Sequence, residues 1–252
     1  MVALVVLAVA LAIVVVVAVV ATRPTPVDPV DQDRPGPVLL VPGYGGSTAA
    51  LDVLADALRR AGRDAEVVAL VPPGTQDLRV QAEALDRAVA RAIDRTGASS
   101  VDVVGYSAGG VVVRLWVAEL GGGSLARRAI TLASPHHGSD LASLGADLAP
   151  DSCPEACRQL AEDSDLLREL NAGDETPAGP AWVSIWTDDD RVVVPPDSGS
   201  LEGSVAFSVQ SVCPGETVSH AALPRTPSVI AMVERELGVD APAVPTSSVC
   251  TP

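Results

Sequence analysis

Lysine is missing from the chain altogether, so all 17 basic residues among its 252 are arginine. This absence excludes the phosphate-binding lysine of P-loop proteins, a lysine that forms Schiff bases, and a serine–lysine catalytic pair. The glycine-rich segment 43–46 therefore does not bind phosphate as a P-loop does. Histidine is almost as scarce, and an imidazole base has to be one of His136, His137 and His220.

Positive charge is also in short supply over the chain as a whole. The 32 acidic residues outnumber the 17 basic ones, which gives a net charge of −15. A molecule this acidic repels polyanions, and its composition therefore argues against a nucleic-acid partner.

Charged and polar side chains are missing from residues 2–21. At about 1.5 Å per residue in a helix, this run spans roughly 30 Å, the thickness of the hydrocarbon core of a bilayer. Its length favours a membrane anchor, whereas the small residues at 19–21 are typical of a signal-peptidase site. Arg23 follows the run and no basic residue precedes it, which opposes the orientation of an exported domain. We expect residues 1–21 to direct export, with the product either membrane-anchored or secreted.

A segment rich in proline and aspartate, residues 22–37, predicts a linker between this run and one globular domain over residues 38–252. Within the domain, strand-like segments alternate with segments of helical periodicity. The predicted strands are 38–41, 66–71, 101–104, 129–133, 181–186 and 205–209. The predicted helices begin at Ser47 or Thr48, at Asp77, after Ser107 and at Thr226. This alternation predicts an α/β fold, with a mostly parallel central sheet covered by helices on both faces.

One long segment, residues 136–180, carries no strand pattern, and we expect it to lie over the site as a partial cap. Two of the four cysteines lie in it, and four cysteines fit an oxidising compartment. Of the three possible pairings, we favour Cys153–Cys157, which are close in sequence, with Cys213–Cys250, which would fasten the proline-rich tail. A metal site at Cys153 and Cys157 is disfavoured because no histidine lies near them in the sequence.

The pentapeptide Gly-Tyr-Ser-Ala-Gly at residues 105–109 joins a predicted strand to a predicted helix. This spacing is typical of a nucleophile elbow, in which a serine sits on a strained turn and its hydroxyl is exposed. Side chains at positions 105 and 109 would collide with the neighbouring strand or helix. Ser107 is therefore the predicted nucleophile, and the backbone N–H of Ala108 is the first predicted donor to an oxyanion.

A serine nucleophile needs a base, and the base needs a carboxylate that orients it. Catalytic groups of a parallel sheet gather at the carboxyl ends of its strands, and in this kind of fold they follow the order serine, acid, histidine. His220 follows the last predicted strand and is the predicted base. Asp190 is the favoured acid of the run Asp-Asp-Asp at 188–190, and Asp188 is the second choice.

His136 and His137 precede any acid-bearing strand, so we expect them to line the pocket or to form local hydrogen bonds. A metal site formed by both with Asp140 is the weaker interpretation. The second oxyanion donor should come from the loop at 41–47, where glycines let the backbone approach the substrate.

With these residues in view, the chain resembles the small bacterial lipases and esterases of the α/β-hydrolase superfamily, triacylglycerol lipases among them. The resemblance runs from about residue 38 to residue 237. Its markers are Val-Pro-Gly-Tyr-Gly-Gly at 41–46, the elbow, Leu-Ala-Ser-Pro-His-His-Gly-Ser at 132–139, Ser-Ile-Trp-Thr-Asp-Asp-Asp at 184–190, and His220.

The resemblance implies an α/β-hydrolase fold and hydrolysis of carboxylic esters through an acyl-serine, with no metal ion or organic cofactor. It places the acid at Asp190 and the second oxyanion N–H at Tyr44. The chain departs from the family at Pro42, where histidine is common. Because the donor is at position 44, the missing N–H of the proline leaves this role intact.

These observations predict an exported ester hydrolase that acts on a lipid or small ester substrate and that contacts the membrane through residues 1–21 if they are not cleaved. Two alternatives stay open. One is an acyltransferase of the cell envelope that uses the same three residues, and the other is a catalytically silent binding protein with a hydrolase fold. The oligomeric state is left open by the sequence.

Overall fold

The structure, a computed structural model, describes residues 27–250. The predicted export segment at 1–21 and the first part of the predicted linker lie outside the described residues. Within residues 27–250, no helix combines the length and the apolar character that crossing a membrane would take.

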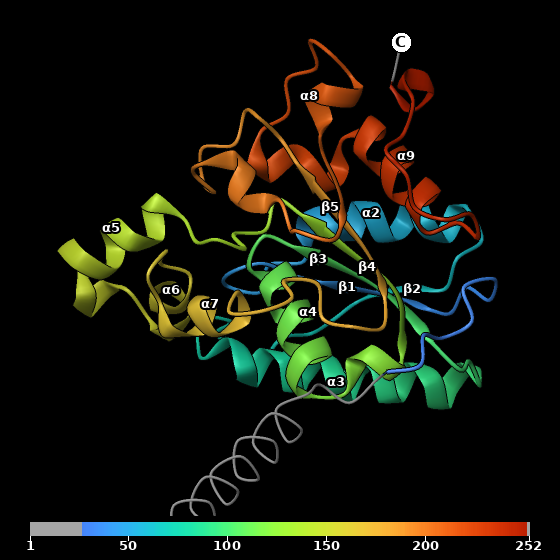
Figure 1. Ribbon diagram of the computed structural model, residues 1–252, viewed down its shortest axis with the longest axis horizontal. Coiled ribbons are helices and arrows are strands. Elements are labelled where there is room, and N and C mark those ends of the chain that lie inside the picture. Colours follow the sequence, from blue (N-terminus) through green and yellow to red (C-terminus); the bar gives the residue numbers. More distant parts are fainter. Residues whose placement is uncertain (1–26, 251–252) are drawn as a thin grey trace, which may run out of the picture.

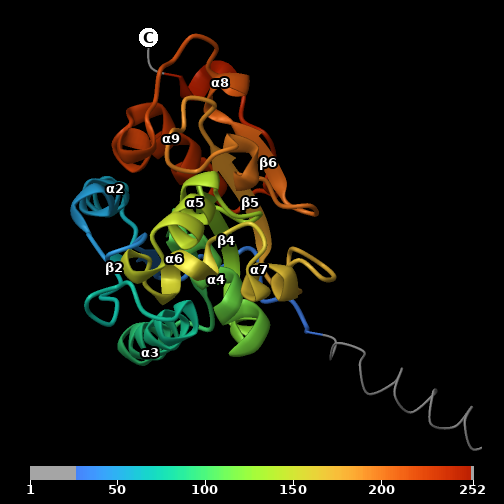
Figure 2. The ribbon, with the colours of Figure 1, turned by 90° about the vertical axis from the view of Figure 1, so that its left-hand side faces the viewer.

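Six parallel strands form one sheet in the order β2-β1-β3-β4-β5-β6. The strands are β1 (Val38–Val41), β2 (Ala65–Val67), β3 (Val101–Tyr106), β4 (Ala126–Leu132), β5 (Ala181–Trp186) and β6 (Val205–Ser208). Helices cover both faces of this sheet, as Figures 1 and 2 show. The predicted α/β-hydrolase architecture is confirmed.

The two edge strands are shorter than predicted. After β2 the chain leaves the ladder, and the backbone N–H and C=O of Val71 bond to the side chain of Gln81 instead of to a strand. At the end of β6, the hydroxyl of Ser208 accepts a hydrogen bond from the N–H of Ser211. That bond caps a short helix, α8 (Val209–Val212), and therefore ends the strand.

Two apolar cores lie on the two faces of the sheet. Alternate residues of β1 point to opposite faces, so Leu39 and Val41 join one core while Val38 and Leu40 join the other. The first core packs against α3 (Leu78–Thr96) and α4 (Ala108–Glu119), and the second packs against α2 (Ala49–Arg60) and α9 (Pro227–Glu236). Figure 1 shows α3 and α4 below the sheet, with α2 and α9 above it. Because both faces are covered, most strand residues are apolar on both sides, and the charged residues of β3 and β4, such as Asp102 and Arg127, lie at the start of their strands.

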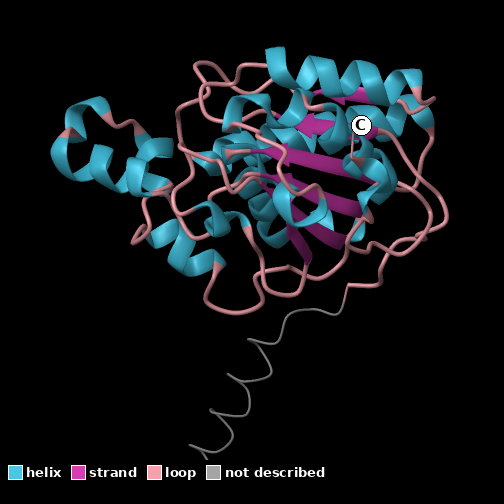
Figure 3. Ribbon diagram, turned by 90° about the horizontal axis from the view of Figure 1, so that it is seen from above, coloured by secondary structure: helices cyan, strands magenta, loops and turns pink. Residues whose placement is uncertain are grey.

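The segment predicted as a partial cap contains three short helices, α5 (Asp140–Leu148), α6 (Glu155–Gln159) and α7 (Asp165–Leu170). Leu160, Leu166 and Leu167 are buried in the same core as α3 and α4. α5 has no buried residue, and it stands out at one edge of the molecule in Figures 1 and 3.

Both predicted disulfides are present. Cys153–Cys157 joins the segment before α6 to that helix, and Cys213–Cys250 joins the end of α8 to the C-terminal tail. The described part of the predicted linker lies against the domain, since the side-chain oxygen of Gln32 accepts a hydrogen bond from Arg128.

Candidate active site

Ser107 lies between the end of β3 and the first residue of α4, on a turn with φ 54° and ψ −129°. A non-glycine residue at positive φ is strained, and such strain is common at functional sites. A Cβ atom added at Gly105 would come 2.5 Å from the Cα of Gly110, and one at Gly109 would come 2.2 Å from the carbonyl oxygen of Val41. The predicted collisions at positions 105 and 109 are therefore confirmed.

A chain of hydrogen bonds joins Ser107 to His220 and Asp190. The Nδ1 of His220 lies 2.7 Å from the Oδ2 of Asp190, and its Nε2 lies 3.1 Å from the Oγ of Ser107. Because an ionised carboxylate only accepts hydrogen bonds, Nδ1 carries the proton in this arrangement. Nε2 is then free to accept the proton of the serine hydroxyl.

The backbone holds the Asp190 side chain in place. Its Oδ1 accepts hydrogen bonds of 2.8 and 2.9 Å from the N–H groups of Val192 and Val193. The hydroxyl of Ser139 donates to the carbonyl of Val192, so the segment after β4 braces this turn. Asp190 and His220 are only 1% and 8% exposed, and the low local dielectric strengthens their hydrogen bond.

The other two aspartates of the run do not reach His220. Asp188 accepts a hydrogen bond from the hydroxyl of Ser208. Asp189 accepts hydrogen bonds from the side chain of Gln210 and from the backbone of Val218. Of the two acids named from the sequence, the one against His220 is therefore Asp190.

Tyr106 was not singled out from the sequence, although it lies inside the elbow motif. Its ring packs against the imidazole of His220 with centroids 5.1 Å apart, and its hydroxyl donates to the carbonyl oxygen of His220. Burial, with a further contribution from Asp190, raises the pKa of Tyr106 to about 12. The phenol therefore stays protonated as a donor and positions the histidine through both its backbone and its ring.

Neither His136 nor His137 lines the cavity at Ser107; His136 forms a local hydrogen bond, and His137 pairs with a residue 38 positions later in the chain. The Nε2 of His136 lies 3.1 Å from the hydroxyl oxygen of Thr131, and burial holds the pKa of His136 well below its usual value. His137 pairs with Glu175 at 2.7 Å. Within the part of the chain that the structure describes, no group of three His, Cys, Asp or Glu side chains could hold a metal ion.

A cavity of about 430 Å³ opens at Ser107. It is lined by the loop after β1 with Tyr44, by the first residues of α2, by Val192, and by the segment from His220 to Arg225. No residue of 136–180 contributes to it. The predicted cap therefore does not line this cavity. The apolar side chains of its later part, Leu160, Leu166 and Leu167 among them, are buried beside α3 and α4, and its first helix, α5, projects away from the core.

The two predicted oxyanion donors belong to segments next to Ser107. Tyr44 lines the cavity together with the serine. Ala108 is the first residue of α4, so its N–H has no acceptor within the helix. The positive end of the helix dipole lies at the same point and favours negative charge there.

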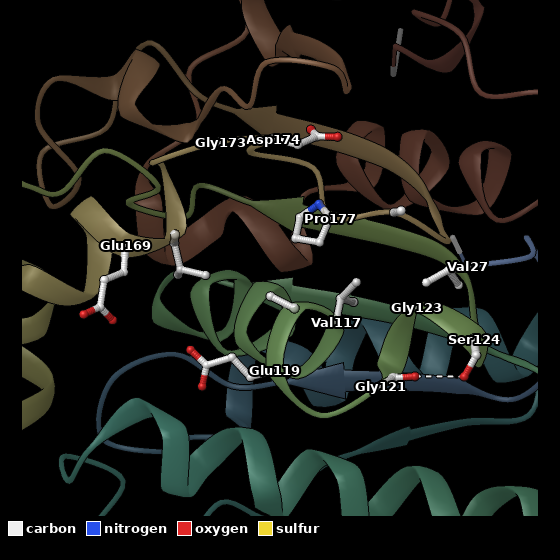
Figure 4. A pocket seen from close by; sticks show the side chains of 13 residues that line it. Val27, Val117, Glu119, Gly121, Gly123, Ser124, Glu169, Gly173, Asp174 and Pro177 are labelled. Atoms are coloured by element: carbon white, nitrogen blue, oxygen red, sulfur yellow. Dashed lines mark hydrogen bonds between the residues drawn. The ribbon is translucent and has the colours of Figure 1, made fainter. Parts of the chain in front are cut away.

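A larger cavity, about 700 Å³, lies away from Ser107 between α4, α7 and the segment at 173–178 (Figure 4). The single hydroxyl in its lining, that of Ser124, donates to the carbonyl of Gly121. No histidine lines this cavity. It offers no nucleophile paired with a base, and we therefore place the candidate site at the smaller cavity.

Comparison of the sequence with models of known protein families identifies one family. A family model described as Lipase (class 2) matches residues 85–220, more than half of the chain. The match includes the elbow, the aspartate run and His220. No curated protein matches the sequence significantly.

Solved structures share the fold at low sequence identity. Lipase B of Aspergillus fumigatus superposes with a TM-score of 0.71 at 22% identity, over 90% of this chain and 59% of the fungal chain. The mature Bacillus licheniformis lipase BlEst2 gives 0.68 at 18% identity, over 85% of this chain and 96% of the other. An α/β-hydrolase from a lagoon-sediment metagenome gives 0.53 at 14% identity, over 80% and 90%. The chain thus spans less than two thirds of the fungal lipase but nearly all of the bacterial one.

Proposed function

The chain belongs to the class 2 lipase family, and on that premise we propose that it hydrolyses carboxylic esters of lipids with Ser107 as the nucleophile. The observation that carries the proposal is the hydrogen-bonded chain from Ser107 through His220 to Asp190. A hydroxyl next to an oriented, unprotonated imidazole nitrogen is the arrangement that activates a serine for attack on an acyl group.

In the acylation step, the Oγ of Ser107 attacks the ester carbonyl while its proton passes to the Nε2 of His220. The imidazolium that forms is stabilised by the carboxylate of Asp190, which stays ionised and accepts a hydrogen bond from the Nδ1–H group. The carbonyl oxygen becomes an oxyanion, and the N–H groups of Tyr44 and Ala108 donate to it. His220 then gives its proton to the departing alcohol, and the acyl group stays on Ser107.

Deacylation repeats these steps with water. His220 takes a proton from the water, whose oxygen attacks the acyl carbonyl, and then returns that proton to the Oγ of Ser107. The products are a carboxylic acid, an alcohol and the original enzyme, so the cycle needs no cofactor.

We further propose that the enzyme acts outside the cytoplasm. Two disulfides among four cysteines support an oxidising compartment. The apolar run at residues 2–21 supports export, either as a cleaved signal or as an anchor.

The test is hydrolysis of p-nitrophenyl esters from acetyl to palmitoyl by the purified protein and by its Ser107→Ala variant. We expect the wild-type protein to hydrolyse these esters and the Ser107→Ala variant to have a kcat lower by several orders of magnitude. The circular dichroism spectrum of the variant should match that of the wild type. Ser124→Ala is the matched control, because this exposed hydroxyl donates only to a nearby carbonyl.

Equal activity of the Ser107→Ala variant and the wild type would refute the assignment of the nucleophile. A wild-type protein that labels with a fluorophosphonate at Ser107 but transfers acyl groups to added alcohols instead of to water would be an acyltransferase. A protein that neither labels nor turns over would be a binding protein.

A further inference from the structure

Arg225 is a charged side chain in the wall of the cavity at Ser107, and we propose that it binds an anionic group on the alcohol part of the substrate. This inference rests on the proposed ester hydrolysis and names its substrate class. The preferred substrates are esters of an alcohol that carries a phosphate or a carboxylate.

Arg225 differs from the other residues that line the cavity by its charge. It is the one lining residue with a permanent charge, and no acidic side chain lines the cavity. The molecule around it has a net charge of −15. The molecule as a whole therefore repels anions, but a cavity whose one permanently charged lining side chain is a cation locally favours an anionic ligand over a cationic one.

Arg225 also has its hydrogen-bonding capacity free. Within residues 27–250, its guanidinium forms no ion pair, although elsewhere Arg63 and Arg127 share Asp102 and Arg79 pairs with Glu119. Its side chain is exposed at the cavity. A guanidinium presents five N–H donors in a planar fork, which matches the oxygens of a carboxylate or phosphate with two parallel bonds.

The position of Arg225 assigns the anion to the alcohol part. Arg225 is the last residue of the short helix η4 (His220–Arg225), and the first is the histidine. In the proposed mechanism His220 gives its proton to the departing alcohol, so the alcohol lies on the η4 side of the cavity. The oxyanion donors, Tyr44 and Ala108, come from other segments.

The backbone that carries Arg225 is held firmly. Leu223 and Pro224 are buried directly before it, and Leu223 belongs to the core shared with α2 and α9. Its guanidinium lies close enough to Tyr106 for its charge to act on that phenol, against the burial that raises the pKa of Tyr106. Because the backbone at Arg225 is already fixed beside the elbow, only the side chain itself has to be ordered when an anion binds.

The experiment uses ortho-nitrophenyl butyrate and the same ester with a carboxylate on its nitrophenyl ring. A third ester, the mono-ortho-nitrophenyl ester of glutaric acid, carries the carboxylate on the acyl part. A separate pair of substrates tests a phosphate in place of the ring carboxylate: fatty-acid release is measured from a monoacylglycerol and from the corresponding lysophosphatidate.

We expect wild-type enzyme to prefer the ring-carboxylate ester and the lysophosphatidate over their neutral partners. Arg225→Gln should reduce this preference, measured as a ratio of kcat/KM values, about tenfold and mainly through KM. Arg225→Lys should keep part of it, since the charge remains while the planar fork is lost. Arg91→Gln, which removes a charge from an exposed arginine of α3 on the opposite face of the sheet, should leave all rates unchanged.

An unaltered preference in Arg225→Gln would overturn the inference while leaving ester hydrolysis intact. Loss confined to the glutarate ester would overturn the assignment to the alcohol part. Binding provides the independent readout if no ester is hydrolysed. Calorimetric titration of Ser107→Ala with the carboxylated nitrophenol should show binding that Ser107→Ala/Arg225→Gln lacks, and equal binding by both would refute the role of Arg225.

Discussion

At the scale of single residues, the run of three aspartates shows how neighbours of one type take different roles. The turn after β5 directs Asp188 and Asp189 toward the segment at 208–218, and it directs Asp190 toward His220. The first two carboxylates hold this loop to its neighbour. The third lies where an imidazolium would need a counter-charge.

Asp190→Asn is expected to lower kcat by about ten-thousandfold, because an amide no longer holds His220 in the required tautomer. Asp188→Asn makes the same chemical change two residues earlier and should lower kcat only a few-fold. Measuring kcat of both variants and of the wild type with a p-nitrophenyl ester tests the two expectations. A large loss in Asp188→Asn with normal turnover in Asp190→Asn would reverse the assignment.

At the scale of elements, the two disulfides close loops of very different length. Cys213–Cys250 spans a sequence separation of 37 residues, and Cys153–Cys157 spans 4. A crosslink stabilises a fold largely by restricting the unfolded chain, and the longer loop loses more entropy. The C-terminal tail gains most, since its described part after α9, up to Cys250, contains only the short helix η5 (Ser247–Val249).

Replacing both cysteines of a pair by serine should therefore cost different amounts of unfolding free energy. We expect a loss of about 4 kcal/mol for Cys213–Cys250 and about 2 kcal/mol for Cys153–Cys157. Urea denaturation followed by circular dichroism measures both, with the unmodified protein as reference. Equal losses would show that chain entropy does not govern these crosslinks.

At the scale of the whole molecule, a buried ionic cluster joins distant segments at the end of the sheet opposite Ser107. The carboxylate of Asp102, at the start of β3, accepts bonds from Arg63 at 2.5 Å and from Arg127 at 2.8 and 2.9 Å. The two arginines also donate to the carbonyls of Gln32, Gly36, Leu237 and Gly238. The cluster thus ties the segment before β1 to the end of α9.

Asp102→Asn should lower the free energy of unfolding by about 3 to 5 kcal/mol, because it leaves the buried guanidinium of Arg127 without its counter-charge. Asp56→Asn, in an exposed pair with Arg59, should change the stability little. Denaturant titration gives both values. The folded fraction of Asp102→Asn should retain normal kcat, since the cluster lies at the far end of β3 from Ser107. A lower kcat would show that the cluster influences the site at the other end of the sheet.

Much of this architecture follows from local signals. All six strands were predicted in the right parts of the chain, because apolar runs bounded by turn residues persist in a sheet covered on both faces. Their ends were predicted less well: β2 ends at Val67 and not at position 71, and β4 begins at Ala126 and not at position 129, because it starts with the buried side chains of Arg127 and Arg128. The elbow follows from a pentapeptide whose glycines have no alternative at that spacing, as the collisions at Gly105 and Gly109 show. The scarcity of histidine narrowed the choice of base before any geometry was available.

Other features depend on how distant segments meet. The sequence alone determined the α/β class, the elbow and the short list of candidate bases and acids, because each rests on residues close together or few in number. It favoured one of three cysteine pairings, and the structure contains that pairing. Only the tertiary structure decided that Asp190 is the aspartate against His220, that Tyr106 supports that histidine, that residues 136–180 leave the cavity uncovered, and that Arg225 lines it. These depend on contacts between segments far apart in the chain, and no local spacing of residues specifies them.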